Sequence, residues 1–455
     1  MPSELADHIA NLSAIDTHSH MAGDLAWERT DAPDILADLF GWYSSSDLIV
    51  AGAAPEAVER LLDRGDGDLE GRFAGVAAAW EAIQVTGYGE AVRIAARDLF
   101  DIDVLRPDTI RAGQKRLEAL RRPGGCIALL RDRARLDHVQ TDLGVDVVDL
   151  SRASAPFFLR DLSVRRFAIG AIDDPVLEQA TGVTIRNVAT LEEAMEALFA
   201  RCGPFSIAVK SQHAYLRTLA WEERTDAEAE RAIQSVLRGE PGSDDPQAPA
   251  RRCLGDWCLG RAARLAISYE LPIKLHTGYL AGTGRDTAMP IDRLRAGHLA
   301  PLLTAYPEAR FVLMHIAYPY SDELIALAKH FGNVTVDLCW AWALNPFVTM
   351  DFLRRFLHAV PVNRLFAFGD DTFTPVMAYA YAAQMRRWLA RTLDAEVADG
   401  CMTIAQAMEV ATRLLRGNQL AAFDIEGRQR AVMAATATYE PHPWPYHYVP
   451  DEATR

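Results

Sequence analysis

The stretch AIDTHSHMAG, residues 14–23, places two histidines, His18 and His20, one residue apart at the end of a short apolar run. In a β-strand, side chains two positions apart point to the same face, so a strand here directs both imidazoles to one point. Two converging imidazoles suit a metal ion. An isolated His-x-His is also compatible with one ring at a turn and the other in solvent, so the rest of the chain must distinguish these alternatives.

Short apolar runs that end in polar or ionisable residues recur along the chain, and most are separated by stretches with helical periodicity. Eight strands that alternate with helices predict an α/β fold of the closed (β/α)8 type, the TIM barrel. The eight expected strands are AIDTHSH (14–20), LDHVQTDLG (136–144), RRFAIGAI (165–172), FSIAVKSQ (205–212), PIKLHTG (272–278), RFVLMHI (310–316), VTVDLCW (334–340) and LFAFGDD (365–371).

The first connection is too long for a minimal barrel and predicts an insertion. Residues 22–135 read as helical almost throughout, and an insertion after the first strand should lie over the carboxyl ends of the strands and wall the substrate pocket. A second insertion follows the fourth strand, where residues 238–252 are rich in Pro, Gly and Asp and predict a mobile surface loop. The expected organisation is a barrel over residues 1–425 and a C-terminal extension over 426–455. The aromatic, Pro-rich residues 439–455 would form an arm on the barrel or on a neighbouring subunit of a homo-oligomer.

Composition narrows the class of protein. Half of the 455 residues are hydrophobic, which is enough for a sizeable core, and the formal net charge of −15 argues against nucleic acid or an anionic membrane as a partner. The N-terminal residues lack the pattern of a signal peptide, and no apolar run is long enough to span a membrane, so we expect a cytoplasmic protein. The six cysteines are scattered, and Cys253 and Cys258 have no second pair to complete a zinc site, which indicates reduced thiols.

Ionisable residues end several of the expected strands. In a barrel, these strand ends meet at one mouth, so three or four histidines and a carboxylate can complete a site for a divalent metal. Each residue alone is weak evidence, whereas their joint placement favours a metal site. The residues are His18 and His20 on the first strand, Lys210 on the fourth, His276 on the fifth, His315 on the sixth, and Asp370 and Asp371 on the eighth.

This pattern resembles the amidohydrolase superfamily, which carries His-x-His on the first strand, often Lys on the fourth, His on the fifth and sixth, and Asp on the eighth. The similarity covers residues 14 to about 425. The stretches IKLHTGYLAGTG, FVLMHIAYPYSDEL, VTVDLCWAWALNPF and LFAFGDDTFTP, together with the helical insertion, look most like the uronate-isomerase-related group called amidohydrolase family 2.

The resemblance implies that His18, His20, His276 and an eighth-strand Asp are metal ligands. Family members usually read Gly-x-Asp at this position, which selects Asp371 over Asp370, and Asp370 would then hydrogen-bond a ligand. In binuclear members the corresponding Lys is carbamylated and bridges two metals. Lys210 would then be carbamylated and His315 would bind the second metal. If Lys210 stays an amine, one metal is bound and both residues face the substrate. We favour two ions, of zinc, manganese or iron.

The expected chemistry is hydrolysis of an amide, lactone or related acyl bond of a small molecule. A divalent metal lowers the pKa of a bound water towards 7 and polarises a carbonyl oxygen. Asp371 would accept the proton of that water and return it to the leaving group, with Lys210 and His315 as the other catalytic residues.

Other reactions remain open on this scaffold. Relatives that resemble this chain isomerise hydroxy-carbonyl substrates or decarboxylate aromatic acids, and for an isomerase the acid and base would come from nearby polar residues. A diiron monooxygenase is a further alternative, because His and carboxylate ligands also suit iron. A purely structural or ligand-binding barrel is the non-enzymatic alternative. The acid and base candidates are Tyr279, Arg285, Tyr318, Tyr320 and Asp337.

Aromatic residues near the expected mouth suggest a substrate with an apolar or planar portion. Trp340 and Trp342 follow the seventh strand, and Tyr279 and Phe347 lie close to it in the fold we expect. The Gly-rich segment 281–287 contains Arg285, which could hold a substrate carboxylate. Tyr279, Arg285 and Trp340 are therefore the substrate-contact candidates.

Overall fold

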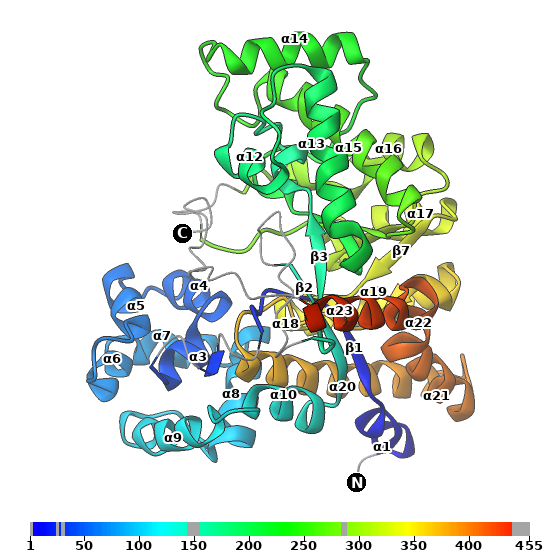
Figure 1. The fold of residues 1–455 in the computed structure, drawn as a ribbon. Coiled ribbons are helices and arrows are strands. Elements are labelled where there is room, and N and C mark those ends of the chain that lie inside the picture. The colour runs from blue at the N-terminus through cyan, green and yellow to red at the C-terminus, as the bar shows by residue number, and fades with distance from the viewer. Residues whose placement is uncertain (1–2, 24–26, 29–31, 143–154, 284–288, 439–455) are drawn as a thin grey trace.

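The computed structural model describes residues 3–23, 27–28, 32–142, 155–283 and 289–438 (Figure 1). Eight parallel strands form one sheet in the order of the sequence, from β1 to β8. Their bounds are β1 Ala14–Ser19, β2 Leu136–Thr141, β3 Phe158–Ser163, β4 Ala208–Ser211, β5 Ile273–Leu275, β6 Phe311–Met314, β7 Val334–Asp337 and β8 Leu365–Phe366.

The barrel closes between β1 and the segment that follows β8. The backbone N–H of Thr17 donates to the carbonyl of Phe368, that of Asp371 donates to His18, and that of His20 donates to Thr372. These bonds hold β1 beside residues 368–372, so His18, His20 and Asp371 are placed by one short stretch of backbone. The predicted (β/α)8 barrel is confirmed.

The third strand differs from the prediction. Residues 165–172 were expected to be a strand, but the structure places β3 at Phe158–Ser163, and Arg165–Ala168 form the short helix α11. The reason is that β3 contains Arg160 and Asp161, so it does not read as an apolar run. Asp161 points into the barrel, where the Lys274 ammonium of β5 donates to both of its carboxylate oxygens at 2.8 Å.

The long first connection is helical and packs as a lobe beside the barrel (Figure 1). Asp34, Asp68 and Thr86 cap the N-termini of α3, α6 and α8 with their side chains, as helix starts favour. Its helices are α3 Ile35–Phe40, α4 Tyr43–Val50, α5 Pro55–Leu62, α6 Leu69–Ala74, α7 Ala77–Ile83, α8 Gly87–Phe100, α9 Pro107–Leu120 and α10 Gly125–Ile127, followed by a π-helical turn at Ala128–Arg133.

The remaining helices surround the strands; those within residues 175–330 form the upper lobe in Figure 1, and the others lie below that lobe. They are α1 Glu4–Asn11, α12 Pro175–Thr181, α13 Val188–Cys202, α14 Asp226–Leu237, α15 Pro249–Ser268, α16 Ala300–Ala305, α17 Ser321–His330, α18 Ala341–Leu344, α19 Pro346–Ala359, α20 Pro375–Ala398, α21 Ile404–Thr412, α22 Asn418–Ala422 and α23 Ile425–Thr438; short 3₁₀ or π turns occupy Gly203–Phe205, His213–Tyr215, Ile291–Leu294, Ala296–Leu299, His315–Ala317, Val362–Arg364 and Arg413–Gly417.

The structure limits one of the two predicted connecting segments and does not describe the other. The loop predicted over residues 238–252 ends earlier, because α15 begins at Pro249, and Arg251 is buried with an ion pair to Asp173. Residues 439–455, the expected arm, lie outside the described residues. Among the described helices, none combines the length and apolar character that crossing a membrane requires.

Candidate metal centre

The two histidines of β1 converge on one carboxylate oxygen. His18 Nε2 and His20 Nε2 each lie 3.1 Å from Asp371 Oδ1. Two ligand atoms bound at about 2.0–2.2 Å to one ion stand roughly 3.0–3.5 Å apart, so this spacing is that of a shared divalent ion. The alternation of β1 brings the two rings together, and the backbone bond from Asp371 to His18 brings the carboxylate.

The hydrogen bonds of His20 test whether this set fits a metal. Its Nδ1 lies 2.6 Å from the carbonyl oxygen of Asp142, and because a carbonyl only accepts, Nδ1 carries the proton. In the neutral ring, Nε2 therefore presents a lone pair to the Asp371 carboxylate. Two acceptors at 3.1 Å require a positive charge between them or a proton on the ring. The donor set thus fits a divalent cation.

His18 is fully buried and takes part in the same arrangement. Burial, and then the nearby Lys210 cation, hold the pKa of His18 well below its usual value of 6.5, so its ring is neutral. Burial alone would raise the pKa of Asp371, but the neighbouring His18 and His20 hold it well below 3.8. An anionic carboxylate beside neutral imidazoles is the protonation state in which these groups bind metals.

Lys210 reaches this cluster from β4. Its Nζ lies 3.0 Å from His18 Nε2, and its side chain is fully buried. Among the described residues, no carboxylate lies within ion-pairing distance of Lys210, whereas Lys274, one strand further, is paired with Asp161. A buried ammonium without an anionic partner is costly, so a modification that removes the positive charge of Lys210 would relieve this cost.

His276 and His315 lie next to each other, with ring centroids 4.3 Å apart. The Nε2–H of His276 donates to the Tyr279 carbonyl at 2.9 Å, and the Nδ1–H of His315 donates to the Cys339 carbonyl at 3.1 Å. Each ring therefore keeps one nitrogen lone pair, and His315 Nε2 is buried without a hydrogen-bond partner. Burial lowers the pKa of His276 well below 6.5 and that of His315 to about 3, so both rings are neutral.

Sequence reasoning missed Cys339 as a member of this site. A His315 nitrogen, the Cys339 thiol and an Asp371 carboxylate oxygen lie within 4.8 Å of one another. The thiol is buried, and Gly369 leaves space for it, because a Cβ at position 369 would stand 2.7 Å from the sulfur. In the VTVDLCW run, Cys339 lies two residues beyond the end of β7, and this position at the carboxyl end of a strand is the signal that could have found it.

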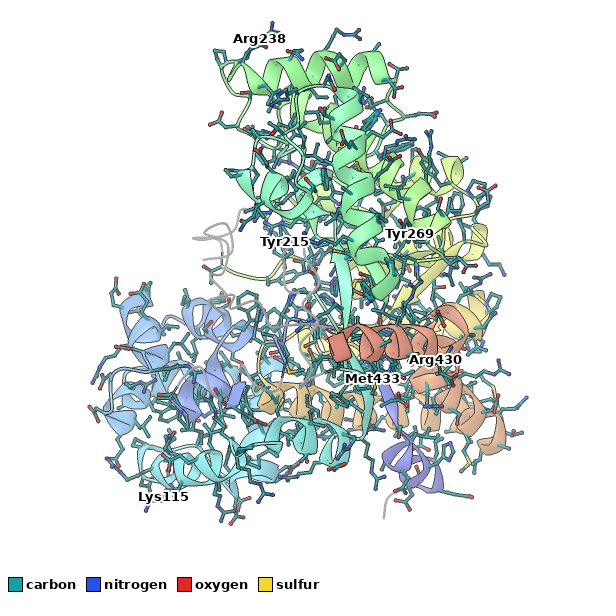
Figure 2. The ribbon with its side chains drawn as sticks, in the orientation of Figure 1. Lys115, Tyr215, Arg238, Tyr269, Arg430 and Met433 are labelled. Atoms are coloured by element: carbon teal, nitrogen blue, oxygen red, sulfur yellow. The ribbon has the colours of Figure 1, made fainter. Side chains whose placement is uncertain are left out.

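Aromatic side chains from the insertion and from the loops after the strands cover the cluster. Tyr43 of α4 donates its hydroxyl hydrogen to the Asp371 carbonyl at 2.7 Å and stacks on Trp340, with ring centroids 4.7 Å apart. Trp340 lies 5.5 Å from the ring of His315 and 5.7 Å from that of Tyr279. Tyr215, labelled in Figure 2, approaches His276 at 4.9 Å. The structure thus brings Trp340 and Tyr279 to the site.

Other candidates lie elsewhere. Phe347 is 62% exposed and packs against Trp388, and the Trp342 indole N–H donates to the Ala367 carbonyl. Tyr318 is near Tyr279, with ring centroids 6.4 Å apart, and Tyr320 stacks with the Arg295 guanidinium. Arg285 lies outside the described residues.

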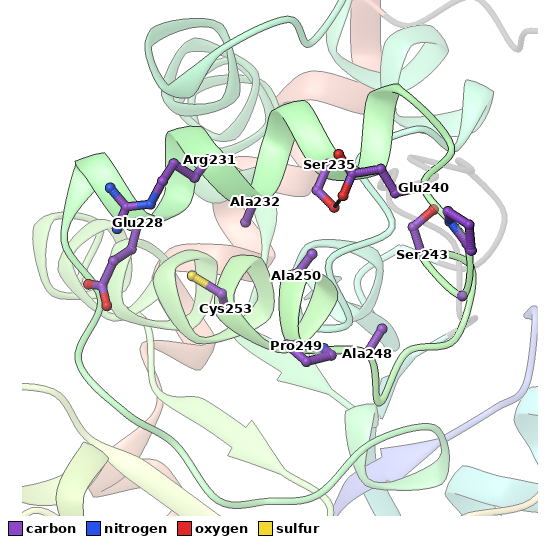
Figure 3. Close-up of a pocket in the computed structure, with 12 residues that line it drawn as sticks. Glu228, Arg231, Ala232, Ser235, Glu240, Ser243, Ala248, Pro249, Ala250 and Cys253 are labelled. Atoms are coloured by element: carbon purple, nitrogen blue, oxygen red, sulfur yellow. Dashed lines mark hydrogen bonds between the residues drawn. The ribbon is translucent and has the colours of Figure 1, made fainter.

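A cavity of about 450 Å³ between α14 and α15, which contains Cys253 but none of the predicted site residues, lies away from the metal centre (Figure 3).

A layer of buried carboxyl groups lies beneath the metal centre. Asp16 Oδ1 accepts from the backbone N–H groups of His18 and Asp370, and Asp370 Oδ1 accepts from Thr372. Asp370 is fully buried and bonded to Asp16, so it supports the backbone that carries Asp371. The two aspartates therefore differ in role, because Asp371 faces the histidines and Asp370 faces away from them.

Asp337 belongs to the same layer and gives the site a testable pH dependence. Its Oδ2 lies 2.6 Å from the Thr17 hydroxyl oxygen, its Oδ1 accepts from the Cys339 N–H at 2.9 Å, and burial raises the pKa of Asp337 to about 7. The unfolded chain ionises this group near 3.8, so its contribution to stability is present below that pH and is lost as pH rises towards 7. The stability of Asp337→Asn relative to the wild type should therefore rise from pH 4 to 7, by up to about 4 kcal/mol, and then level off.

Urea unfolding of the wild type and the variant at several pH values measures this difference. Asp137→Asn is the control, because His138 and Arg416 lower the pKa of Asp137 to about 2, outside the window. Its stability relative to the wild type should not change between pH 5 and 7. A gap between Asp337→Asn and the wild type that is constant over this range would mean that Asp337 is ionised in the folded protein.

The amino-acid sequence is similar to those of known proteins. The family model described as Amidohydrolase matches residues 119–418. Protein fluG of Emericella nidulans is 29% identical over 233 residues, which are 49% of this chain and 26% of that protein, so the match spans about a quarter of the curated relative.

Solved structures that share the fold include two isomerases. The uronate isomerase of Thermotoga maritima aligns with a TM-score of 0.74 at 16% identity, covering 92% of this chain and 96% of that one. The glucuronate isomerase of Caulobacter crescentus aligns with a TM-score of 0.68 at 18% identity, covering 92% of each chain. With the family match over most of the barrel and a His/Asp cluster at the strand ends, the chain belongs to the amidohydrolase family.

Proposed function

We propose that this protein is a metal-dependent hydrolase that cleaves an amide, lactone or related acyl bond of a small molecule. The observation that carries the proposal is the placement of Lys210, which is fully buried, 3.0 Å from His18 Nε2 and without a carboxylate partner among the described residues. A carbamylated Lys210 would supply an anionic oxygen ligand between two ions, one near His18 and His20 and one near His276 and His315.

When bound, the metal lowers the pKa of a water molecule towards 7 and polarises the carbonyl of the substrate. Asp371 is anionic and next to both β1 histidines, so it accepts the proton of the attacking water and delivers it to the leaving group. His315 keeps a buried nitrogen without a partner and can bind either metal or substrate. Tyr43 and Trp340 shield this volume from solvent, which strengthens every charge interaction within it.

Isomerisation is the second candidate, because two of the solved structures that share this fold are isomerases of uronates. An isomerase needs an acid–base pair, and a proton transfer of this kind does not call for a modified Lys210. Oxygenation is a further outcome that the same experiment separates.

The test is the metal content of the full-length protein, purified with bicarbonate and measured by elemental analysis together with Lys210→Met. We expect about two zinc or manganese ions per chain at this centre in the wild type and at most one there in the variant, so the wild type should hold at least one ion per chain more than Lys210→Met. Lys115→Met, a substitution at an exposed lysine labelled in Figure 2, should keep both ions.

A panel of amides, lactones and uronates then distinguishes the reactions. Release of an amine, alcohol or acid supports hydrolysis, and conversion of a uronate at unchanged mass replaces hydrolysis with isomerisation. One ion per chain in both the wild type and Lys210→Met would overturn the bridging role of Lys210. Two irons per chain whose absorption changes with oxygen after reduction would favour an oxygenase.

A further inference from the structure

A second group of metal-ligating side chains lies where two helices of the barrel end. Donor atoms of His358, Glu396 and Cys401 all lie within 4.8 Å of one another. His358 is in the last turn of α19, Glu396 is in the last turn of α20, and Cys401 follows α20. None of the three belongs to the metal centre described above.

Local backbone structure brings the thiol to the carboxylate. Gly400 adopts a φ of 74°, which ends α20 with a left-handed turn, and the N–H of Cys401 donates back to the Glu396 carbonyl at 2.9 Å. The thiol of Cys401 hydrogen-bonds to the Glu396 side chain. His358 Nε2 lies 2.7 Å from Glu396 Oε2. Nitrogen, oxygen and sulfur donors therefore meet at one point.

The carboxylate is held in place for a ligand role. Glu396 is fully buried, and its other oxygen accepts from the Arg354 guanidinium, which also pairs with Asp399. A second partner that orients a ligating carboxylate is common in metal sites. The side chain of His358 is 55% exposed and Cys401 is exposed, so both can adjust and an ion can reach them.

The charges also favour a divalent ion. The carboxylates of Glu396 and Asp399 and the guanidinium of Arg354 have a summed formal charge of −1, to which an uncharged imidazole and thiol add nothing. A divalent ion that binds with loss of the thiol proton brings the total charge of the group to zero. The carboxyl ends of α19 and α20, both at this point, attract positive charge. Zinc accepts this mixture of His, Cys and Glu ligands at about 2.0–2.3 Å, which needs donor atoms roughly 3.3–3.8 Å apart.

We propose that His358, Glu396 and Cys401 bind a zinc-class divalent ion, with water as the fourth ligand, and thereby clasp α19 to α20. Binding forms a metal–sulfur bond and releases the thiol proton to solvent, with no change in oxidation state. The helices that follow barrel strands end near the amino-terminal face of the barrel, opposite the mouth, and residues on that face serve stability. The clasp therefore stabilises the fold and leaves catalysis unchanged.

Cobalt reports directly on the thiolate. The full-length holoprotein, kept reduced with a phosphine, is titrated with Co²⁺, and thiolate-to-cobalt absorption is recorded. We expect this absorption to saturate at one added cobalt per chain and to be absent in Cys401→Ser. In His358→Ala, the affinity for cobalt should fall at least tenfold. Cys339→Ser, which removes the thiol near the metal centre, should keep it.

Heat denaturation gives the second measurement. Zinc added to the holoprotein should raise the melting temperature of the wild type and leave that of Cys401→Ser unchanged, while the two proteins have equal activity. A folded wild type without thiolate absorption would overturn the clasp. So would absorption that persists in Cys401→Ser and is lost in Cys339→Ser, because the metal would then be bound at the barrel mouth.

Discussion

Replacement of His18 by alanine should reduce the affinity of the protein for its metal by more than about 100-fold and abolish turnover. The reason is that His18 Nε2 lies beside both Asp371 and Lys210, so the variant loses the nitrogen that both share. Loss of even an outer partner of a ligand costs about 10- to 100-fold in metal affinity, and loss of a ligand costs more. Metal content by elemental analysis, together with substrate turnover, measures the effect.

His138→Ala is the matched control for this substitution. His138 is a fully buried histidine of β2, bonded to Asp137 and Gln140 and not to the metal centre. Both variants leave a cavity in the barrel, so their free energies of unfolding should fall by similar amounts. Other large-to-small core substitutions cost roughly 2–5 kcal/mol. His138→Ala should nevertheless keep its metal. Full metal occupancy in a folded His18→Ala protein would remove His18 from the ligand set.

Asp371→Asn should retain part of the metal and lose turnover by a factor of about 100 to 10,000, the range for loss of a general acid–base group. The amide keeps one oxygen towards the histidines but cannot accept the proton of water. The carboxylate is the only group of the centre, among the described residues, that lies within 3.1 Å of both β1 rings. Steady-state turnover at saturating metal measures the loss.

Asp370→Asn separates the two neighbouring aspartates. Asp370 is bonded to Asp16 and Thr372, and burial raises its pKa well above 3.8, so it is protonated and an amide resembles it closely. Turnover in this variant should therefore stay within about tenfold of the wild type. If Asp370→Asn lost turnover while Asp371→Asn kept it, the proton-transfer role would belong to Asp370.

The barrel could be predicted because most of its strands are apolar runs that end in polar residues. β3 shows where this signal fails, since Phe158–Ser163 carries Arg160 and Asp161 in the middle of a strand. Asp161 tolerates burial because Lys274 of β5 donates to both of its oxygens. That pairing joins strands far apart in sequence, so nothing local distinguishes β3 from a loop, and the apolar residues 165–172 look more like a strand.

Part of the candidate site could also be predicted, because the ends of the apolar strands are recognisable in the sequence. Same-face spacing indicates His18 and His20, and strand ends indicate Lys210, His276 and His315. The distinction between Asp370 and Asp371 depends on which one donates its backbone N–H to the Asp16 carboxyl group and which one faces the rings, and two adjacent aspartates in the sequence do not show this. The strand-end pattern also does not predict that His18 is fully buried, because Tyr43 and Trp340, which cover the cluster, come from other segments.

The seam between β1 and residues 368–372 has a consequence for biosynthesis. The Thr17 hydroxyl donates to the Phe368 carbonyl, 351 positions later in the chain, and His18 and His20 meet Asp371 across the same seam. While the ribosome is still translating the middle of the protein, the imidazoles of His18 and His20 do not yet have the Asp371 carboxylate with which they would share an ion. Loading of this ion must therefore follow translation of nearly the whole barrel, and a nascent chain released before Asp371 cannot assemble this three-residue cluster.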